Sequence, residues 1–557
     1  MSLNTQHGKP WPKGAVIYQI YPRSFLDSND DGIGDLSGIT AKLDYVASLG
    51  VDAIWLSPFF TSPMRDFGYD VADYCGVDPV FGMLADFDAL IAKAHDLKLK
   101  VIIDQVYSHT SDQHPWFAES RRDRTNDKAD WYVWADPKPD GTPPNNWMSV
   151  FGGVSWEWDA RREQYYLHNF LTSQPDLNLH SRAVQDALLD VTRFWLDRGV
   201  DGFRLDAINF AMHDPKLRDN PPAKIGDHQP KRTFDFQEHI YNQSHADIPK
   251  FLQRIRAVTD EYKNIFTVAE VVGPNAHKEM KAFTAGETHL TTAYNFDFLY
   301  ADELTPKQVI RSLSAWSGES REALPAWAFS NHDAPRCISR WAPDSQNSTA
   351  DPTQAAKLYL LLLIALRGDI FVYQGEELGL PQADVGFDDL QDPEAIANWP
   401  ETLGRDGART PMPWEATGIN GGFSRAKPWL PFDPRHIPMA VDAQEGDQAS
   451  VLNFARAAIG LRRASPALRE GAIKFLEAPE GVLAFIRKSS SETHLCLFNF
   501  SQNGLALPKS FAGLGAVRLS AGLQINATPN ALSALTGVIA AINQEELANL
   551  PKAVINA

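Results

Sequence analysis

Short apolar segments alternate along most of the chain with segments in which apolar residues recur every three or four positions. The first apolar segment, Ala15–Pro22, is rich in residues that favour strands. The segment after it carries apolar residues on one helical face: Ile39, Leu43, Val46 and Leu49. Val51–Pro58 is then apolar with little alternation, which is typical of a strand buried on both faces. The pattern predicts buried parallel strands connected by amphipathic helices.

The same alternation continues far along the sequence. It predicts eight strands: Ala15–Pro22, Val51–Pro58, Lys100–Val106, Gly202–Ala207, Ile265–Val272, Leu290–Phe296, Leu324–Asn331 and Ile370–Gln374. Eight buried strands alternating with helices favour a closed (β/α)8 TIM barrel of the α/β class. A doubly wound open sheet gives the same alternation, and periodicity alone does not choose between the two.

Two segments depart from this alternation and predict further domains. Residues 107–178 are rich in Trp, Pro, Gly and Asp, lack a helical period and are too long for a connecting loop, so we expect a small inserted domain there. A second long excursion covers Ala211–Pro249. Near the end, Val482–Lys488 and His494–Phe500 predict a hairpin, and residues 471–557 a C-terminal antiparallel β domain. Residues 1–106 and 179–470 are then the two parts of the barrel.

Composition excludes several classes of protein. The chain has 557 residues, a net charge of −18 and a pI of about 5.3, which disfavours nucleic acid and anionic membranes as partners. Its three cysteines are far apart, so no disulfide framework or zinc site is expected. The most apolar run, Leu358–Leu366, is too short to span a bilayer, and the first residues lack the apolar core of a signal peptide. We expect a cytoplasmic monomer or homodimer.

Polar residues end several of the predicted strands. They are Asp104 and His109, Arg204 and Asp206, Glu270, and His332 and Asp333. In a barrel the carboxyl ends of the strands meet at one mouth, so the carboxylates of Asp206, Glu270 and Asp333 are predicted to converge there. Arg204 and Asp206 are two positions apart and point to the same side of their strand.

These segments resemble a known family in composition and order. Four of them resemble the signature regions of glycoside hydrolase family 13, the α-amylase family: Asp104–His109, Gly202–Asn209, Val268–Glu270 and Phe329–Asp333. Gln174–Asn178 and Gly404–Trp414 resemble motifs of its oligo-1,6-glucosidase and α-glucosidase branch. The resemblance covers roughly residues 11–500. It implies a barrel (domain A), a domain B inserted after the third strand and an antiparallel β domain C.

The resemblance also implies roles for the carboxylates. Asp206 is the expected nucleophile, Glu270 the general acid/base and Asp333 the transition-state stabiliser, while His109 and His332 hydrogen-bond the bound glucose. Cleavage with retention needs the two reacting carboxyl groups about 5–5.5 Å apart. We expect Arg204 to lower the pKa of Asp206, and burial beside other carboxylates to raise the pKa of Glu270.

Further residues bear on specificity. By resemblance, Asp66 pairs with Arg409 at the closed end of the glucose pocket and Tyr69 stacks on the sugar ring, which implies exo action; a surface ion pair is the alternative. The residue after the nucleophile, Ala207, is small, which within this branch favours α-1,4 over α-1,6 bonds; core packing is the alternative.

An acidic loop follows the first predicted strand. Asp27, Asn29 and Asp31 alternate along it with a glycine after them, as oxygen ligands do in a tight Ca²⁺ loop, but the glutamate of an EF-hand is missing. The loop resembles the calcium loop of this branch, in which the carbonyl of Ile33 and the side chain of Asp35 complete the shell. Mg²⁺ and an acidic turn without metal are the alternatives. No organic cofactor is expected.

The prediction for function is a retaining, exo-acting α-glucosidase that releases glucose from short α-1,4-linked glucosides such as maltose and transfers it to sugar or alcohol acceptors. The alternatives are an oligo-1,6-glucosidase, a sucrose-cleaving enzyme or a trehalose synthase of the same family. A non-catalytic relative, like the heavy chains of some amino-acid transporters, is disfavoured because all three carboxylates are present. Pro413 and Gly407 depart from the branch pattern, which bears on the leaving-group side of the pocket.

Overall fold

The computed structural model describes residues 11–224, 232–273, 275–294, 296–316, 325–341, 351–400, 404–511, 515–522 and 531–556. Three sequence predictions extend beyond these ranges. Leu324 and Asn295 of two predicted strands lie outside the described residues, as does part of the Ala211–Pro249 excursion.

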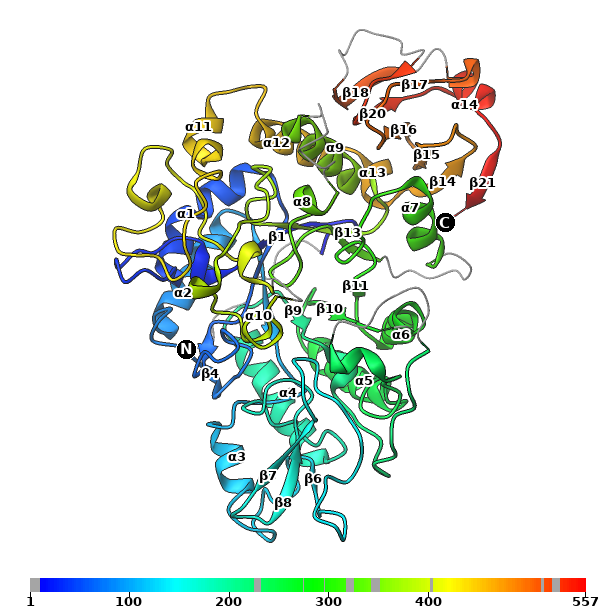
Figure 1. Ribbon diagram of the computed structural model, residues 1–557. Coiled ribbons are helices and arrows are strands. Elements are labelled where there is room, and N and C mark those ends of the chain that lie inside the picture. The colour runs from blue at the N-terminus through cyan, green and yellow to red at the C-terminus, as the bar shows by residue number, and fades with distance from the viewer. Residues whose placement is uncertain are drawn as a thin grey trace.

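Eight parallel strands form the centre of the molecule (Figure 1). They are β1 (Val16–Ile20), β2 (Ala53–Leu56), β5 (Lys100–Gln105), β9 (Gly202–Leu205), β10 (Phe266–Glu270), β11 (Thr292–Tyr294), β12 (Ala326–Ala328) and β13 (Asp369–Tyr373). Their order is β11-β10-β9-β5-β2-β1-β13-β12, and the strands at its two ends, β11 and β12, contact each other. The sheet therefore curls into a near-closed barrel, which confirms the predicted TIM barrel over the open sheet.

Helices surround the barrel and bury the faces that the sequence predicts. They are α1 (Leu36–Ser48), α2 (Leu84–Asp96), α4 (Arg182–Asp197), α5 (Ile248–Thr259), α6 (Ala276–Phe283), α7 (Pro306–Ser314), α8 (Cys337–Trp341) and α9 (Pro352–Ala365). In α1 the buried residues include Ile39, Leu43 and Val46, because a spacing of three or four places them on one side. No helix in the described ranges is long and apolar enough to cross a membrane.

A small sheet lies between β5 and α4 in the chain. Its strands β6 (Trp134–Ala135), β8 (Gln164–Leu167) and β7 (Trp156–Asp159) are antiparallel, and the short helix α3 (Pro115–Ser120) precedes them. In Figure 1 this group lies below the barrel strands. Leu217 and Tyr241, from the long excursion after β9, pack against its core. A short hairpin of β3 (Phe60–Thr61) and β4 (Asp73–Val77) follows β2.

The C-terminal part is an antiparallel sheet, as predicted. Its order is β18 (Ala516–Ala521), β20 (Thr536–Ala541), β16 (Thr493–Asn499), β15 (Val482–Lys488), β14 (Ala472–Leu476) and β21 (Ala553–Asn556). The minor elements are β17 (Leu505–Ala506), β19 (Ala531–Leu532), α10 (Pro393–Asn398), α11 (Val441–Glu445), α12 (Val451–Ala464), α13 (Pro466–Glu470) and α14 (Gln544–Asn549). The second strand of the predicted hairpin begins one residue earlier than expected, at Thr493. The exact limits of the domains remain predictions.

Two buried arginines bind the segment that ends α9: Arg462, on α12, and Arg487, on β15 of the C-terminal sheet. Arg462 and Arg487 are both fully buried. Arg462 donates to backbone carbonyl groups around the C-terminus of α9: Gly14 O at 3.1 Å, Ile364 O at 2.6 Å, Leu366 O at 2.9 Å and Gly368 O. Arg487 donates to Ala365 O at 2.6 Å and Gly471 O at 3.0 Å. Ile364 and Ala365 are in the last turn of α9, where the negative end of the helix dipole favours a cation.

Replacing Arg462 with methionine should therefore destabilise the fold without changing the chemistry. The apolar side chain leaves several buried carbonyl groups without a donor, at about 1–3 kcal/mol for each. We expect a clear fall in melting temperature, with near-normal turnover well below it. Arg463→Met is the matched control, because Arg463 is exposed and next in the chain. Equal melting temperatures for the two variants would contradict this role.

Candidate active site

One arginine binds three carboxylates at the mouth of the barrel. Arg204 is fully buried at the end of β9. Its Nη1 lies 2.7 Å from Asp104 Oδ1 and 2.5 Å from Asp206 Oδ1, and its Nη2 lies 2.5 Å from Glu270 Oε1. Asp206 and Glu270 thus bind the two terminal nitrogens of one guanidinium group. Their carboxyl groups must face the same small space, as a pair that reacts with one sugar carbon requires.

The register of the strands explains this convergence. Arg204 on β9 is in register with Asp104 on β5, so both side chains leave the barrel at the same height. Glu270 on β10 is likewise in register with Tyr294 on β11, whose hydroxyl donates to Glu270 Oε1 at 3.1 Å. The backbone N–H of Ala207, the residue after Asp206, donates to Glu270 Oε2 at 3.0 Å. The groups that contact Glu270 therefore come from β11, from β9 and from the residues just after β9.

Burial controls the protonation of this cluster. It raises the pKa of Glu270 to about 7, as predicted, and raises the pKa of Asp104 to about 6. It also raises the pKa of Asp206 to about 7; Arg204 opposes this, and Asp104 and Asp333 add to it. Arg204 does act to lower the pKa of Asp206, as predicted, but burial outweighs it and the net pKa is raised. One guanidinium cannot neutralise three buried carboxylates, so the group keeps a proton near neutral pH, shared as a coupled set.

Asp333 lies in a different electrostatic environment. Arg409 Nη2 lies 2.8 Å from Asp333 Oδ1, and Arg405 Nη1 lies 3.5 Å from the same oxygen. Burial alone raises the pKa of Asp333, but His332 and the two arginines outweigh it and hold the pKa well below its usual range. Asp333 is therefore ionised whenever the enzyme is near neutral pH.

His332 connects Asp333 to Gln19 and Tyr69. Burial lowers its pKa to about 3, so the ring is neutral at pH 7. Gln19 Nε2 lies 2.8 Å from its Nδ1 and donates to it, which places the ring proton on Nε2. Nε2 then donates towards Asp333 Oδ2 at 3.1 Å and lies 2.5 Å from the hydroxyl of Tyr69.

The ion pair at the end of the pocket differs from the prediction. Asp66 Oδ1 lies 2.9 Å from Arg405 Nη2, so Arg405 is its partner, and the expected pair with Arg409 is wrong. Asp392 binds the same nitrogen at 2.8 Å and holds Arg405 over Asp66. Arg409 instead binds Asp333 and donates from Nε to His332 O at 2.7 Å. Both arginines belong to the Gly404–Trp414 motif, four residues apart.

Residues of the inserted segment complete the pocket. Gln174 Nε2 donates to Asp66 Oδ2 at 3.0 Å and lies 3.1 Å from His109 Nε2. His109 Nε2 also lies 3.1 Å from the carbonyl of Tyr69, and burial lowers its pKa to about 4. The structure therefore brings together Asp66, Tyr69 and His109 with the three carboxylates.

Sequence reasoning assigned no role to five groups of this site: Gln19, Gln174, Tyr294, Asp392 and Arg405. Gln174 and Arg405 stand inside motifs that the sequence already marked. Tyr294 lies inside the predicted strand Leu290–Phe296 and ends the observed strand β11, so the rule that found Glu270 applies to it once the end of the strand is known. Gln19 and Asp392 carried no such signal, because a glutamine inside an apolar strand and an aspartate before a helix have ordinary structural roles.

The predicted metal ligands lie in one tight loop after β1. Asp27 accepts from the backbone of its own loop, at Asn29 N, Asp30 N and Gly32 N. Asp35 caps α1 by accepting from Gly38 N at 2.6 Å. The donors are all oxygen, which fits a hard cation such as Ca²⁺. In the part of the chain that the structure describes, however, no three acidic, histidine or cysteine side chains gather as a metal site would need.

The residue after Asp206 has an unusual backbone. Ala207 is in the left-handed region, with φ 35° and ψ 42°, and is buried. A left-handed conformation is unfavourable for bulky or β-branched residues, so a small residue suits this position. It also aims the Ala207 N–H at Glu270. The backbone at this position therefore helps to orient the carboxyl group of Glu270.

Comparison with known proteins agrees with this geometry. The alpha-amylase catalytic domain model matches residues 19–471. A probable alpha-glucosidase of Rhizobium meliloti (strain 1021) is 56% identical over 500 residues, which cover 88% of this chain and 90% of that protein. An oligo-1,6-glucosidase of Heyndrickxia coagulans is 37% identical over 533 residues, covering 88% and 92%.

A solved structure is similar over nearly the whole fold. The crystal structure of the alpha-glucosyl transfer enzyme XgtA superposes with a TM-score of 0.89 at 49% sequence identity, covering 96% of this chain and 100% of that one. The matched model spans the barrel, the inserted segment and all three carboxylates at its mouth. The chain belongs to the α-amylase family of glycoside hydrolases, glycoside hydrolase family 13.

Proposed function

We propose that the protein is a retaining, exo-acting α-glucosidase that cleaves short α-1,4-linked glucosides such as maltose. The observation that carries this proposal is the binding of Asp206 and Glu270 by one guanidinium group, that of Arg204. Two carboxyl groups held so close together favour double displacement, since an inverting enzyme needs room for a water molecule between them.

The reaction has two balanced steps. Asp206 attacks the anomeric carbon while Glu270 gives its proton to the leaving oxygen, so the glycosidic bond breaks as an ester to Asp206 forms. Glu270, now a carboxylate, takes the proton of a water or alcohol hydroxyl, whose oxygen attacks the same carbon and releases Asp206. Ionised Asp333 accepts hydrogen bonds from ring hydroxyl groups, because its pKa stays low next to Arg409 and Arg405.

Exo action follows from the end of the pocket. Asp66 is buried, and Arg405 and Gln174 bind one of its oxygens each. We infer that this buried group of charges would close the space behind a glucose bound at Asp206 and Glu270. We propose that only the non-reducing terminal glucose fits, with Tyr69, His109 and His332 along its ring.

The acceptor and the linkage depend on the other side of the pocket. The similarity to XgtA, an alpha-glucosyl transfer enzyme, supports transfer of glucose to sugar or alcohol acceptors in addition to hydrolysis. Similarity to an oligo-1,6-glucosidase supports the alternative of α-1,6 cleavage. The small side chain of Ala207 favours cleavage of the α-1,4 bond. Sucrose cleavage and trehalose formation remain alternatives, since they would use the same carboxylates. Three free cysteines suit a reducing cytoplasm.

We also propose that the loop after β1 binds Ca²⁺ as a structural ion. The side chains of Asp27, Asn29, Asp31 and Asp35 and the carbonyl of Ile33 would hold it, with Mg²⁺ as the competing ion. The loop lies between β1 and α1, after a short 3-10 helix at Pro22–Ser24, so an ion there would stabilise the first βα unit. No step of the reaction depends on it.

Product analysis tests the reaction. Maltose, isomaltose and sucrose are incubated separately with the enzyme, with and without a simple primary alcohol, and followed by proton NMR. We expect maltose to react fastest, fresh glucose to appear as the α anomer, and an alkyl α-glucoside to form with the alcohol. Asp206→Asn should lower turnover by roughly 10³-fold or more while leaving the circular dichroism spectrum unchanged. Initial release of β-glucose, or normal turnover by Asp206→Asn, would refute the mechanism.

The linkage prediction is tested at Ala207. Ala207→Val should shift the ratio of kcat/KM for maltose and isomaltose towards isomaltose by roughly tenfold, since small changes of shape in a pocket are worth about 1–3 kcal/mol. The ratio is the measurement, because valine in a left-handed backbone also lowers both rates. Ala207→Ser is the control and should keep the maltose preference. An unchanged ratio for valine would show that this residue does not set linkage.

Chelation tests the metal. Removing Ca²⁺ should lower the melting temperature, and free Ca²⁺ at 100 times its Kd should restore about 2.7 kcal/mol of stability. Asp31→Asn should abolish this response, whereas Asp30→Asn, a change in the same loop at a residue outside the expected ligand set, should keep it. A melting curve that ignores chelator, Ca²⁺ and Mg²⁺ would refute an exchangeable ion.

A further inference from the structure

An aromatic face runs from the core of the inserted sheet to its surface. Trp156 and Trp158 are two positions apart on β7, so they lie on the same face of the sheet. Trp156 is opposite Leu167 and buried, whereas Trp158 is opposite Tyr165 and 41% exposed. The face of the sheet that carries the buried ring of Trp156 thus also carries an indole ring that faces solvent.

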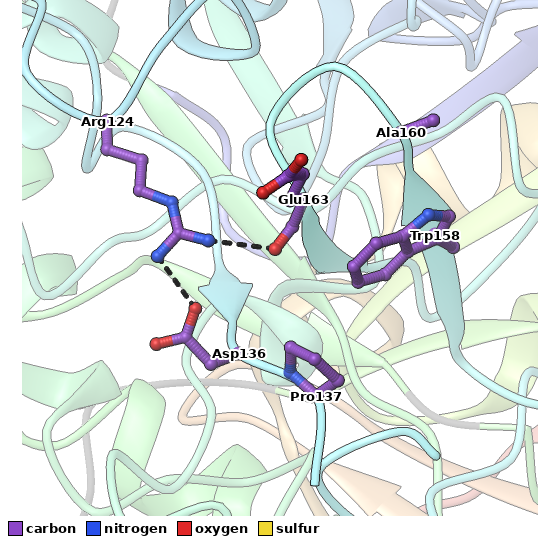
Figure 2. A pocket seen from close by; sticks show the side chains of 6 residues that line it. All are labelled: Arg124, Asp136, Pro137, Trp158, Ala160 and Glu163. Atoms are coloured by element: carbon purple, nitrogen blue, oxygen red, sulfur yellow. Dashed lines mark hydrogen bonds and ion pairs between the residues drawn. The ribbon is translucent and has the colours of Figure 1, made fainter. Parts of the chain in front are cut away.

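An open hollow of about 650 Å³ lies against this ring (Figure 2). Its lining residues are Arg124, Asp136, Pro137, Trp158, Ala160 and Glu163. Because the hollow is open to solvent, a ligand there would lie against the lining with its other face exposed. Arg124 spans the hollow: its Nη1 lies 2.9 Å from Asp136 Oδ1 and its Nη2 donates to the backbone oxygen of Glu163 at 2.8 Å.

The ring of Trp158 is supported from one side. Tyr165 approaches it at 5.1 Å between ring centroids and 65° between planes, and the hydroxyl of Tyr165 donates to Gly141 O at 2.9 Å. Arg124 is fixed in turn by the carbonyl of Arg162, 3.3 Å from its Nε. The aromatic and the charged sides of the hollow are therefore both formed before any ligand arrives, which lowers the entropic cost of binding.

The lining has the chemistry that recognises a pyranose ring. An indole face packs against the apolar C–H face of a sugar, and carboxylate and guanidinium groups pair with its hydroxyl groups. Within the described ranges, the carboxylate of Glu163 and the indole N–H of Trp158 have no hydrogen-bond partner. An acceptor and a donor thus remain available beside the ring. A protein partner would need a much larger apolar surface than one tryptophan and one proline provide.

We propose that this hollow is a second carbohydrate-binding site, which holds one pyranose ring of an α-glucoside against Trp158 while Glu163 accepts hydrogen bonds from its hydroxyl groups. It is separate from the pocket at Asp206 and takes no part in bond cleavage. The choice of an α-glucoside as ligand rests on the proposed function. The site would hold the enzyme on longer glucosides or raise the local concentration of substrate.

Fluorine NMR on the full chain tests this site. The Asp206→Asn protein, which should not consume its ligand, is labelled with 5-fluorotryptophan, and the resonance that disappears in Trp158→Phe is assigned to Trp158. Titration with maltotriose should shift this resonance along a saturable curve. Glu163→Ala should weaken the fitted Kd by roughly tenfold, the effect of losing a charge-assisted hydrogen bond. Sorbitol, which has hydroxyl groups but no ring, should cause no saturable shift.

Glu157→Ala is the matched control, since Glu157 is exposed on the opposite face of the same strand. It should leave the Kd unchanged. A Trp158 resonance that maltotriose does not move would overturn the proposal, as would equal losses of affinity in Glu163→Ala and Glu157→Ala. If maltotriose were hydrolysed by the labelled protein, the nucleophile assignment would fail instead, so the two hypotheses fail separately.

Discussion

Charge balance around Arg204 is the constraint on which the site depends. Three carboxylates contact one fully buried guanidinium group, so the cluster carries excess negative charge unless it keeps a proton. The raised pKa values of Asp206 and Glu270 express this in the folded state. Both values lie above those of the unfolded chain, so the folded protein binds more protons between roughly pH 4 and pH 7. The stability from this cluster is complete below that window and is lost as pH rises through about 7. The proton whose loss weakens the fold at high pH is the one that an acid catalyst needs.

A second cluster separates the roles of similar residues. Asp333 is an aspartate in the segment that follows β12, but Arg409 and Arg405 bind it in place of Arg204, which binds Asp206. Its pKa is therefore lowered while that of Asp206 is raised. The pH dependence of its contribution to stability is the opposite of that of Asp206. The contribution of Asp333 is present near neutral pH and is lost in acid. Splitting the carboxylates between two sets of arginines gives one group that is ionised near neutral pH and one pair that shares a proton, as acid–base chemistry at one sugar ring requires.

The sequence was most informative where one local rule decided the structure. Strand ends in a barrel share one mouth, so the position of Glu270 relative to Asp206 followed from the alternation of strands and helices. It was least informative where two similar residues competed. Arg405 and Arg409 lie in one motif. Asp392, outside that motif, binds Arg405 and helps to hold it next to Asp66. The net pKa of Asp206 could not be predicted for a related reason. The lowering effect of Arg204 was visible in the sequence, whereas the depth of burial and the number of carboxylates around Asp206, which raise the pKa, were not.

The inserted segment connects the two carbohydrate sites physically. Its residue Gln174 contacts Asp66 and His109 at the closed end of the catalytic pocket. Its sheet carries Trp158 at the other extreme, and Trp156, on the same face, belongs to a core that also includes Leu217 and Tyr241 of the long excursion after β9. The same aromatic packing therefore anchors the excursion that begins just after Asp206 and supports the exposed ring. A ligand on Trp158 would stabilise this packing rather than touch the reacting atoms, so its effect should fall on how the pocket wall is held and not on the carboxylates themselves.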